Sequence, residues 1–273
     1  MSGAAFRWEA VSVTKRAAEQ ASVIERALST PVHPERAAAS KAYLKLDMAF
    51  TGASVPQART AVTAWRRAQT DLTRSHLLAV TDSLWRRPVF ECRMAAVIML
   101  TDRKRLLEAA DMDVVEQMLR ESQTWALVDG LAADVAGSLV ARFPELGSTL
   151  DRWAADADFW IRRSALLALL VPLRRGDALP FVRFGRYADQ MLAEREFFIR
   201  KAIGWVLRET AKKQPELVIE WLAPRTHVAS GVTMREAVKY LPSAEAAMLM
   251  AAYREQRPAE SVGLTVASSP AAR

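Results

Sequence analysis

The sequence contains little of what secreted, metal-binding and membrane-spanning proteins use. Cysteine occurs once among the 273 residues, at Cys92, which excludes a disulfide within the chain and fits a reducing compartment. The three histidines and the scattered carboxylates show no metal-ligand spacing, so we expect neither a metal nor another cofactor. No run of about 18 apolar residues occurs, which excludes a transmembrane helix.

Motifs of secretion and of the common enzyme classes are also missing. Charged residues interrupt the N-terminal region, so no secretory signal is present, and we expect a cytoplasmic, nucleoid-associated protein. Neither a glycine-rich phosphate loop nor a G-x-S-x-G motif occurs. The single thiol lies in ECRMAAVIML, where a small buried residue is a simpler interpretation than a catalytic nucleophile.

Acidic residues are fewer than basic residues in the sequence. The chain has 38 Lys and Arg residues against 31 Asp and Glu residues, a net charge of +7 and an isoelectric point of about 9.8. This balance favours a polyanionic partner, nucleic acid above all, although many basic proteins bind none. The hydrophobic share of 51% and the charged share of 25% are ordinary for a soluble globular protein.

Glycine is scarce, with 10 residues, and no segment alternates apolar and polar positions, so the chain is predicted to be helical almost throughout. Arg-x-Ala followed by apolar residues recurs from Arg93, Arg163, Arg200 and Arg235. The spacing is about 35 residues or twice that, and the first gap leaves room for one more copy near residue 128. Degenerate helix pairs at this period predict an all-α solenoid of HEAT-like repeats with a concave binding surface.

Three parts are expected along the chain. Residues 1–30 are predicted to form an N-terminal helical extension, and residues 31–256 the HEAT-like repeat domain. Residues 257–273 are small and polar, and we expect them to be disordered.

Trp205 lies on the charged side of a segment that otherwise has the pattern of a core helix. When EFFIRKAIGWVLRE (196–209) and the residues after it are wound as a helix, one side carries Ile199, Ile203, Val206 and Thr210, and the opposite side Lys201, Trp205, Arg208 and Lys212. One interpretation is a tryptophan packed against the next repeat, beside solvated cations. The other is an aromatic ring in a basic groove that binds phosphates and sugars.

A second candidate site lies in QTWALVDGLAADVAG (123–137). Its buried side is predicted to hold Leu127, Val128, Leu131 and Val135. Trp125 and Asp129, four residues apart, project together from the edge of this helix. An aromatic ring beside a lone carboxylate could stabilise a cationic transition state; the alternative is a solvated or capping acid.

The helix predicted in FWIRRSALLALL (159–170) begins with two arginines although the rest of it is apolar. One of Arg162 and Arg163 cannot easily avoid the buried side, so it needs an anionic partner or a path to solvent. A structural salt bridge is the alternative to a functional role.

The stretch EFFIRKAIGWVLRETAKKQPELV (196–218) closely resembles the signature helix of the AlkD-like DNA alkylation repair glycosylases, which are enzymes of HEAT-like repeats. The resemblance covers most of 35–242, in order and at compatible spacing. It extends to KAYLKLDMAFTGASVPQAR (41–59), LWRRPVFECRMAA (84–96), TWALVDGLAADVAG (124–137), FWIRRSALLALL (159–170) and MREAVKYL (234–241). The first match is highly specific, whereas the others are weak when taken alone.

The resemblance implies an active site of two tryptophans, an aspartate and an arginine, which fall on Trp125, Trp205, Asp129 and Arg163. It also implies a monomer that binds duplex DNA on its concave face without flipping the damaged base into a pocket. The residues expected to contact DNA are Tyr43, Arg162, Arg163, Lys201, Arg208 and Lys212. The chain departs from the family in its longer N-terminus, in one tryptophan where some relatives have a tandem pair, and in Ala126-Leu127 before Val128. These departures bear on lesion preference.

The implied reaction is hydrolysis of the N-glycosidic bond of cationic N3- or N7-alkylated purines in duplex DNA, a step of base excision repair. The alternative is a non-catalytic HEAT-like module that binds DNA or protein, because some relatives of this fold lack activity. Asp129 beside Trp125 discriminates between the two, since a pure binding module does not need that carboxylate.

Overall fold

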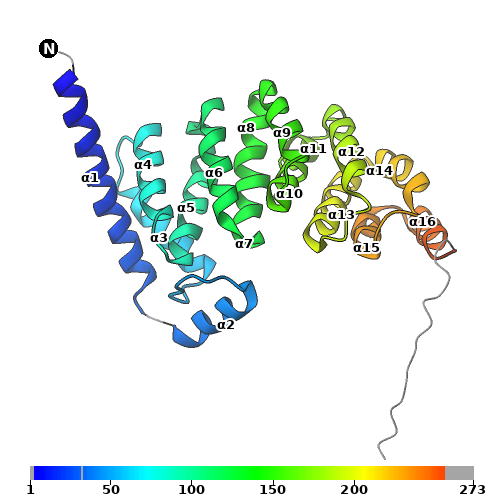
Figure 1. Ribbon diagram of the computed structural model, residues 1–273, viewed down its shortest axis with the longest axis horizontal. Coiled ribbons are helices and arrows are strands. Elements are labelled where there is room, and N and C mark those ends of the chain that lie inside the picture. The colour runs from blue at the N-terminus through cyan, green and yellow to red at the C-terminus, as the bar shows by residue number, and fades with distance from the viewer. Residues whose placement is uncertain (1–2, 32, 256–273) are drawn as a thin grey trace, which may run out of the picture. The chain divides into compact units, whose positions relative to one another are not determined.

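The computed structural model describes residues 3–31 and 33–255, and side chains from Lys15 onward. Helices make up most of this part of the chain, as the composition predicts (Figure 1). The α-helices are α1 (Gly3–Leu28), α2 (Pro34–Leu44), α3 (Val55–Arg67), α4 (Arg74–Trp85), α5 (Phe90–Arg103), α6 (Met112–Ser122), α7 (Trp125–Asp129), α8 (Gly137–Arg142), α9 (Gly147–Ala154), α10 (Phe159–Leu167), α11 (Leu170–Arg175), α12 (Leu179–Met191), α13 (Phe197–Ala211), α14 (Pro215–Leu222), α15 (Gly231–Ala237) and α16 (Ser243–Glu255). No strand forms within the described residues; the only β contact there is an isolated bridge between Ala49 and Val89.

The repeated Arg-x-Ala motif marks one helix in each repeat. Its four copies begin in α5, α10, α13 and α15, and the extra copy predicted near residue 128 falls in the stretch from α7 to α8. The four alanines, Ala95, Ala165, Ala202 and Ala237, are fully buried. Their small side chains allow neighbouring helices to approach closely, which explains why the motif recurs.

The chain forms two compact units, one ending at Gln190 and the other beginning at Met191. The boundaries expected for the N-terminal helical extension (1–30) and the repeat domain (31–256) stay predictions. Helix α1 packs against α4, α3 and α5 within the first unit. The tail predicted over 257–273 lies outside the described residues.

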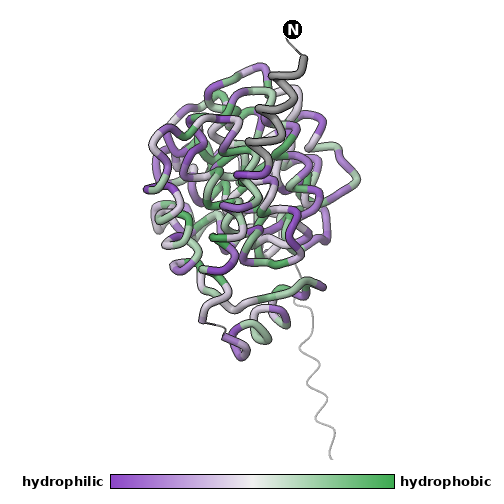
Figure 2. The backbone as a smooth tube through the Cα atoms, turned by 90° about the vertical axis from the view of Figure 1, so that its left-hand side faces the viewer, coloured by the Kyte–Doolittle hydropathy of each residue, from purple (hydrophilic) through white to green (hydrophobic). Residues whose placement is uncertain are grey.

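The core is apolar and aromatic. In the first unit, Trp153, Phe184 and Tyr187 are among the largest fully buried side chains. Viewed from the side of α1, hydrophobic positions concentrate in the interior and hydrophilic positions at the outer turns (Figure 2). This pattern is typical of stacked amphipathic helices.

Local sequence explains where helices begin and break. Ser54 and Gln57 form a capping box at the start of α3. Asp158 caps α10 by accepting a hydrogen bond from the backbone N–H of Trp160, at 2.8 Å. The helix then breaks between Leu167 and Leu170, because Pro172 has no N–H to donate to the carbonyl of residue 168.

Candidate functional site

The first unit holds a buried ion pair between Asp129, at the end of α7, and Arg163, on α10. Nε and Nη2 of Arg163 donate to the two carboxylate oxygens of Asp129 at 2.9 and 3.0 Å. The arginine side chain is 3% exposed and the aspartate side chain 22% exposed. A bidentate pair of this kind fixes the orientation of the carboxylate as well as holding it in place. Asp129 thus keeps one open side, and its other side is held by a buried cation.

Burial and the neighbouring Arg163 shift the pKa of the Asp129 carboxyl in opposite directions. Burial raises the pKa of Asp129 above its ordinary value, and the charge and hydrogen bonds of Arg163 offset part of this rise. The carboxylate is therefore less hydrated than a surface acid but still paired with a permanent cation. A desolvated carboxylate interacts strongly with a positive charge that develops near it.

The backbone that carries Asp129 is irregular, which the sequence did not predict. Thr124 caps α7, and directly after Asp129 the helix continues as a π-helical segment, Gly130–Ala136. Segments of this kind are frequent at functional sites because they shift the side chains that follow out of the regular helical register. The predicted buried side is confirmed, since Leu127, Val128, Leu131 and Val135 are fully buried.

Trp125 is exposed at the start of α7, at the edge of an apolar cavity of about 410 Å³. Tyr43, from α2, meets the tryptophan edge to face, with ring centroids 6.2 Å apart. The tyrosine is 72% exposed, so both rings are available to a partner. Phe90, Met94, Val97 and Ile98 form the apolar wall of the cavity, and Arg59 and Asp134 are its charged lining residues. Sequence reasoning missed this cavity, because its walls come from four segments that are distant in the chain.

The two arginines of α10 differ in their surroundings. The guanidinium of Arg163 is buried and donates to Asp129, whereas Arg162 is half-buried; their contacts with DNA stay predictions. The predicted need for an anionic partner is thus met by Asp129 itself. Arg162 donates through Nη1 to the carbonyl oxygens of Asp156 and Ala157, at 2.7 and 2.9 Å, and so ties the start of α10 to the preceding loop.

The second unit carries Trp205 on α13, in the surroundings that the helical pattern predicts. Ile199, Ile203, Val206 and Thr210 are fully buried, whereas Trp205, Lys201 and Arg208 are half-buried and Lys212 is exposed. The tryptophan therefore lies on the cationic face of its helix. Lys212 lies over the Tyr240 ring, 4.8 Å from its centroid, which adds a second aromatic residue to this face.

Acidic residues hold these cations in place. Glu236, from α15, accepts from Lys201 at 2.6 Å, from Lys239 at 2.9 Å and from Arg208. Burial on its own would raise the pKa of Glu236, but the three cations outweigh it and lower the pKa to about 2. One carboxylate bound to three cations leaves a positive surplus, and Lys212 donates to Glu209 at 2.7 Å beside it. The face around Trp205 is thus basic and pre-ordered.

Comparison with known proteins places the chain in a family. The family model described as DNA alkylation repair enzyme matches residues 24–241, which includes both tryptophans, Asp129 and Arg163. The chain belongs to this family. A role in alkylation repair, and hence binding to DNA, follows from membership. No curated protein matches the chain.

Solved structures of other proteins have the same helical-repeat fold as this chain. One from Enterococcus faecalis, described as a predicted DNA alkylation repair enzyme, superposes with a TM-score of 0.68 at 23% identity, covering 78% of this chain and 97% of its own. AlkD2 from Streptococcus mutans gives 0.53 at 15% identity, covering 70% and 91%. At these identities the likeness establishes the fold alone.

Metal-binding clusters and membrane-spanning helices are both absent from the part of the chain that the structure describes. No cluster of three or more histidine, cysteine, aspartate or glutamate side chains is placed to bind a metal there. Within the same residues, no helix has the length and apolar content needed to span a bilayer. Cys92 is buried, and burial raises the pKa of its thiol to about 11, which makes it a poor nucleophile.

Proposed function

We propose that the protein is a DNA glycosylase that hydrolyses the N-glycosidic bond of cationic N3- and N7-alkylated purines in duplex DNA. The observation that carries this proposal is the half-open Asp129 carboxylate, held bidentately by buried Arg163 and followed along the chain by a π-helical segment. A protein that only binds DNA gains nothing from a desolvated carboxylate, because it repels phosphates.

The chemistry suits so small a site. An alkylated purine with a positive charge leaves as a neutral base, so its departure needs little acid catalysis. The positive charge moves to the deoxyribose, which becomes oxocarbenium-like as the bond breaks. Asp129 stabilises that cation and positions or deprotonates the attacking water, which adds to the sugar carbon and leaves an abasic site. Arg163 acts as a positioning residue that keeps the carboxylate oriented and ionised.

Aromatic rings supply the remaining stabilisation. The face of the Trp125 ring is electron-rich, and it attracts the electron-poor sugar in a contact related to cation–π interaction. We assign Trp205 of the second unit to the same reaction, on the strength of its basic surroundings and of the family resemblance. Tyr43, in edge-to-face contact with Trp125, extends the aromatic surface available to the nucleic acid. No base pocket is required, because the charged lesion is already activated for departure.

The decisive experiment incubates the protein with duplex DNA that holds one 7-methylguanine, and then measures abasic sites after brief alkali treatment. Base release above the spontaneous rate is expected from the wild type and not from an Asp129→Asn variant. Undamaged duplex of the same sequence serves as the substrate control. Binding of both duplexes without any release would instead support the non-catalytic module, and a monomeric mass in solution is expected in either case.

A further inference from the structure

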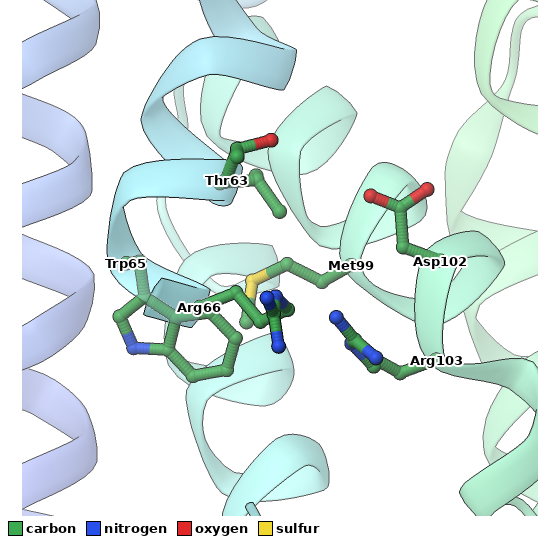
Figure 3. Close-up of a pocket in the computed structure, with 7 residues that line it drawn as sticks. Thr63, Trp65, Arg66, Met99, Asp102 and Arg103 are labelled. Carbon is green, nitrogen blue, oxygen red and sulfur yellow. The ribbon is translucent and has the colours of Figure 1, made fainter. Parts of the chain in front are cut away.

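The ends of α3 and α5 form a cationic cleft that the proposed active site does not use. It encloses about 220 Å³ and is lined by Val62, Thr63, Trp65, Arg66, Met99, Asp102 and Arg103. Figure 3 shows the guanidinium groups of Arg66 and Arg103 extending into the same space from the two helices. A neighbouring cleft of about 300 Å³ shares both arginines and adds Lys104 and Arg105. The positive charge is therefore concentrated at one place.

Neither arginine is neutralised within the part of the chain that the structure describes. The carboxylate of Asp102 lies at the cleft but makes no ion pair with Arg66 or Arg103. The Nε atom of Arg103 is buried and has no hydrogen-bond partner. A buried donor without an acceptor is costly, and two guanidinium groups in one cleft repel each other. Both arginines lie in the last turn of their helix, where the dipole favours a cation, but the dipole does not satisfy the Nε atom.

A bound anion would offset the repulsion between the two guanidinium groups. Guanidinium groups bind phosphate oxygens with paired N–H donors, and Thr63 also lines the cleft. Arg59, Thr63 and Arg66 share one side of α3, because they stand four and seven residues apart. Arg59 lines the cavity beside Trp125, and Arg66 lines the cleft. The backbone positions of these two arginines are about 10 Å apart along the helix axis.

We propose that Arg66 and Arg103 form an anion site for a backbone phosphodiester of duplex DNA, on the same strand path that passes Trp125. This inference rests on the proposed function, since it takes the bound polyanion to be DNA. The site holds the duplex against α3 and α5 independently of the lesion. It therefore contributes equally to the binding of damaged and undamaged DNA.

The test compares the affinity for an undamaged duplex over a range of salt concentrations. The variant Arg66→Gln with Arg103→Gln is expected to bind about tenfold more weakly at 0.1 M salt, and to lower the slope of log affinity against log salt by about 0.9 for one lost phosphate. The matched control is Arg26→Gln with Arg86→Gln, which removes two exposed charges of the first unit from α1 and from the end of α4. The control is expected to keep the slope.

A second pair of variants leaves both arginines in place. Thr63→Glu puts a carboxylate into the cleft, whereas Ala64→Glu puts one on the next residue of α3, which is exposed and does not line the cleft. Only Thr63→Glu is expected to weaken binding by more than about tenfold, because it neutralises the site and repels phosphate. Melting temperatures close to wild type for all four proteins show that the fold is kept.

The outcomes separate this inference from the proposed function. If the wild type binds duplex with a steep salt slope and the cleft variants match their controls, the phosphodiester site is wrong and DNA binding stands. If inorganic phosphate binds the wild type and not the arginine variant, while duplex affinity is the same for both, the cleft is a site for free phosphate and the inference is overturned. If the wild type does not bind duplex at all, both proposals fail.

Discussion

Arg163 donates to both carboxylate oxygens of Asp129 from a position where two other copies of the repeat use arginine to bind backbone carbonyls. The corresponding Arg93 donates to the carbonyl oxygens of Trp85 and Glu121, at 3.1 and 2.8 Å, and Arg200 to that of Glu194 at 2.7 Å. Among these arginines Arg163 is the buried one, whereas Arg93 and Arg200 are half-buried. In the repeat of Arg163 an aspartate takes the place of the carbonyl acceptors, and the arginine supports a candidate catalytic group.

Asp129→Asn removes the charge of the proposed stabiliser and keeps its shape. Losing one well-placed electrostatic contact is expected to slow single-turnover release of 7-methylguanine by about 10²–10³. Duplex affinity is expected to hold or improve, because a negative charge has left the surface that we propose to face DNA. The variant also leaves Arg163 buried without a counter-charge, so its melting temperature is expected to fall. Rates are therefore compared well below that temperature, and release at the wild-type rate would remove Asp129 from the mechanism.

The pH dependence of excision tests Arg163 as a positioning residue. The mechanism needs the ionised form of Asp129, so protonation of Asp129 is expected to lower the enzyme-dependent rate as pH decreases. Because burial raises the pKa of Asp129, this fall should begin at a higher pH than it would for an ordinary aspartate. Arg163→Met removes the cation that lowers this pKa, so the fall should move to higher pH. The rate is measured in single turnover after subtracting acid-catalysed depurination of free DNA. An unmoved profile in Arg163→Met would mean that the arginine acts only on the fold.

The helical stack and much of the site were predictable because they depend on short-range pattern. The period of Arg-x-Ala located the helices, and the helical arrangement of apolar residues placed Trp205 and Asp129 away from the core. The Asp129–Arg163 pair was not predicted by spacing, since it joins residues 34 positions apart in neighbouring repeats. An arginine in an otherwise apolar helix needs an anionic partner, and this requirement was the signal in the sequence that could have pointed to the pair.

Other features depend on tertiary structure that no local pattern encodes. The π-helical segment Gly130–Ala136 follows Asp129, and a regular helix fits the same sequence equally well. Glu236 holds Lys201 and Arg208 from 35 and 28 positions away, so the pattern marked the cations but not the acid that orders them. The cleft of Arg66 and Arg103 has the same origin, because it forms only where two helix ends meet.

Trp205→Ala is expected to weaken both duplex binding and base release. In the proposed mechanism the Trp205 ring contacts the nucleic acid before the reaction as well as in the transition state, so its removal is expected to affect both quantities. Base or sugar stacking on an aromatic ring is worth about 1–3 kcal/mol, which predicts a loss of roughly 5- to 150-fold in affinity. Phe197→Ala is the control, because Phe197 is an exposed aromatic at the start of the same helix. Equal losses in the two variants would contradict a specific contact between Trp205 and the nucleic acid.

Salt should control the affinity for DNA, because lysine and arginine contacts to phosphates release counterions and read no sequence. Affinity for an undamaged duplex is expected to fall by roughly 10³ between 50 and 200 mM salt if about six phosphates are contacted. Duplexes of different sequence should give the same curve. Titrations by fluorescence anisotropy at four salt concentrations measure this directly, and a flat dependence would contradict a basic DNA-binding surface.

The stack itself should lose stability in acid through Glu116, on α6. Arg152 donates to both of its carboxylate oxygens, at 2.8 and 2.6 Å, and Trp153 and Arg120 each donate at 2.7 Å. The bonds from Arg152, with those from Trp153 and Arg120, outweigh the effect of burial and lower the pKa of Glu116 to about 2. A carboxyl whose pKa is lower in the folded state stabilises the fold above its unfolded pKa and loses that contribution as pH falls.

Glu116→Gln is therefore expected to lower the free energy of unfolding at pH 7 by about 1–3 kcal/mol, the cost of hydrogen bonds to a charged group. The difference from wild type should shrink as pH falls from about 4.5 toward 2, because the wild-type carboxylate is protonated over that range. Urea denaturation at a series of pH values measures it. Glu19→Gln, on the exposed face of α1, is the control and should stay close to wild type throughout. A difference that does not change with pH would show that the side-chain shape of Glu116, and not its charge, holds α6 against α9.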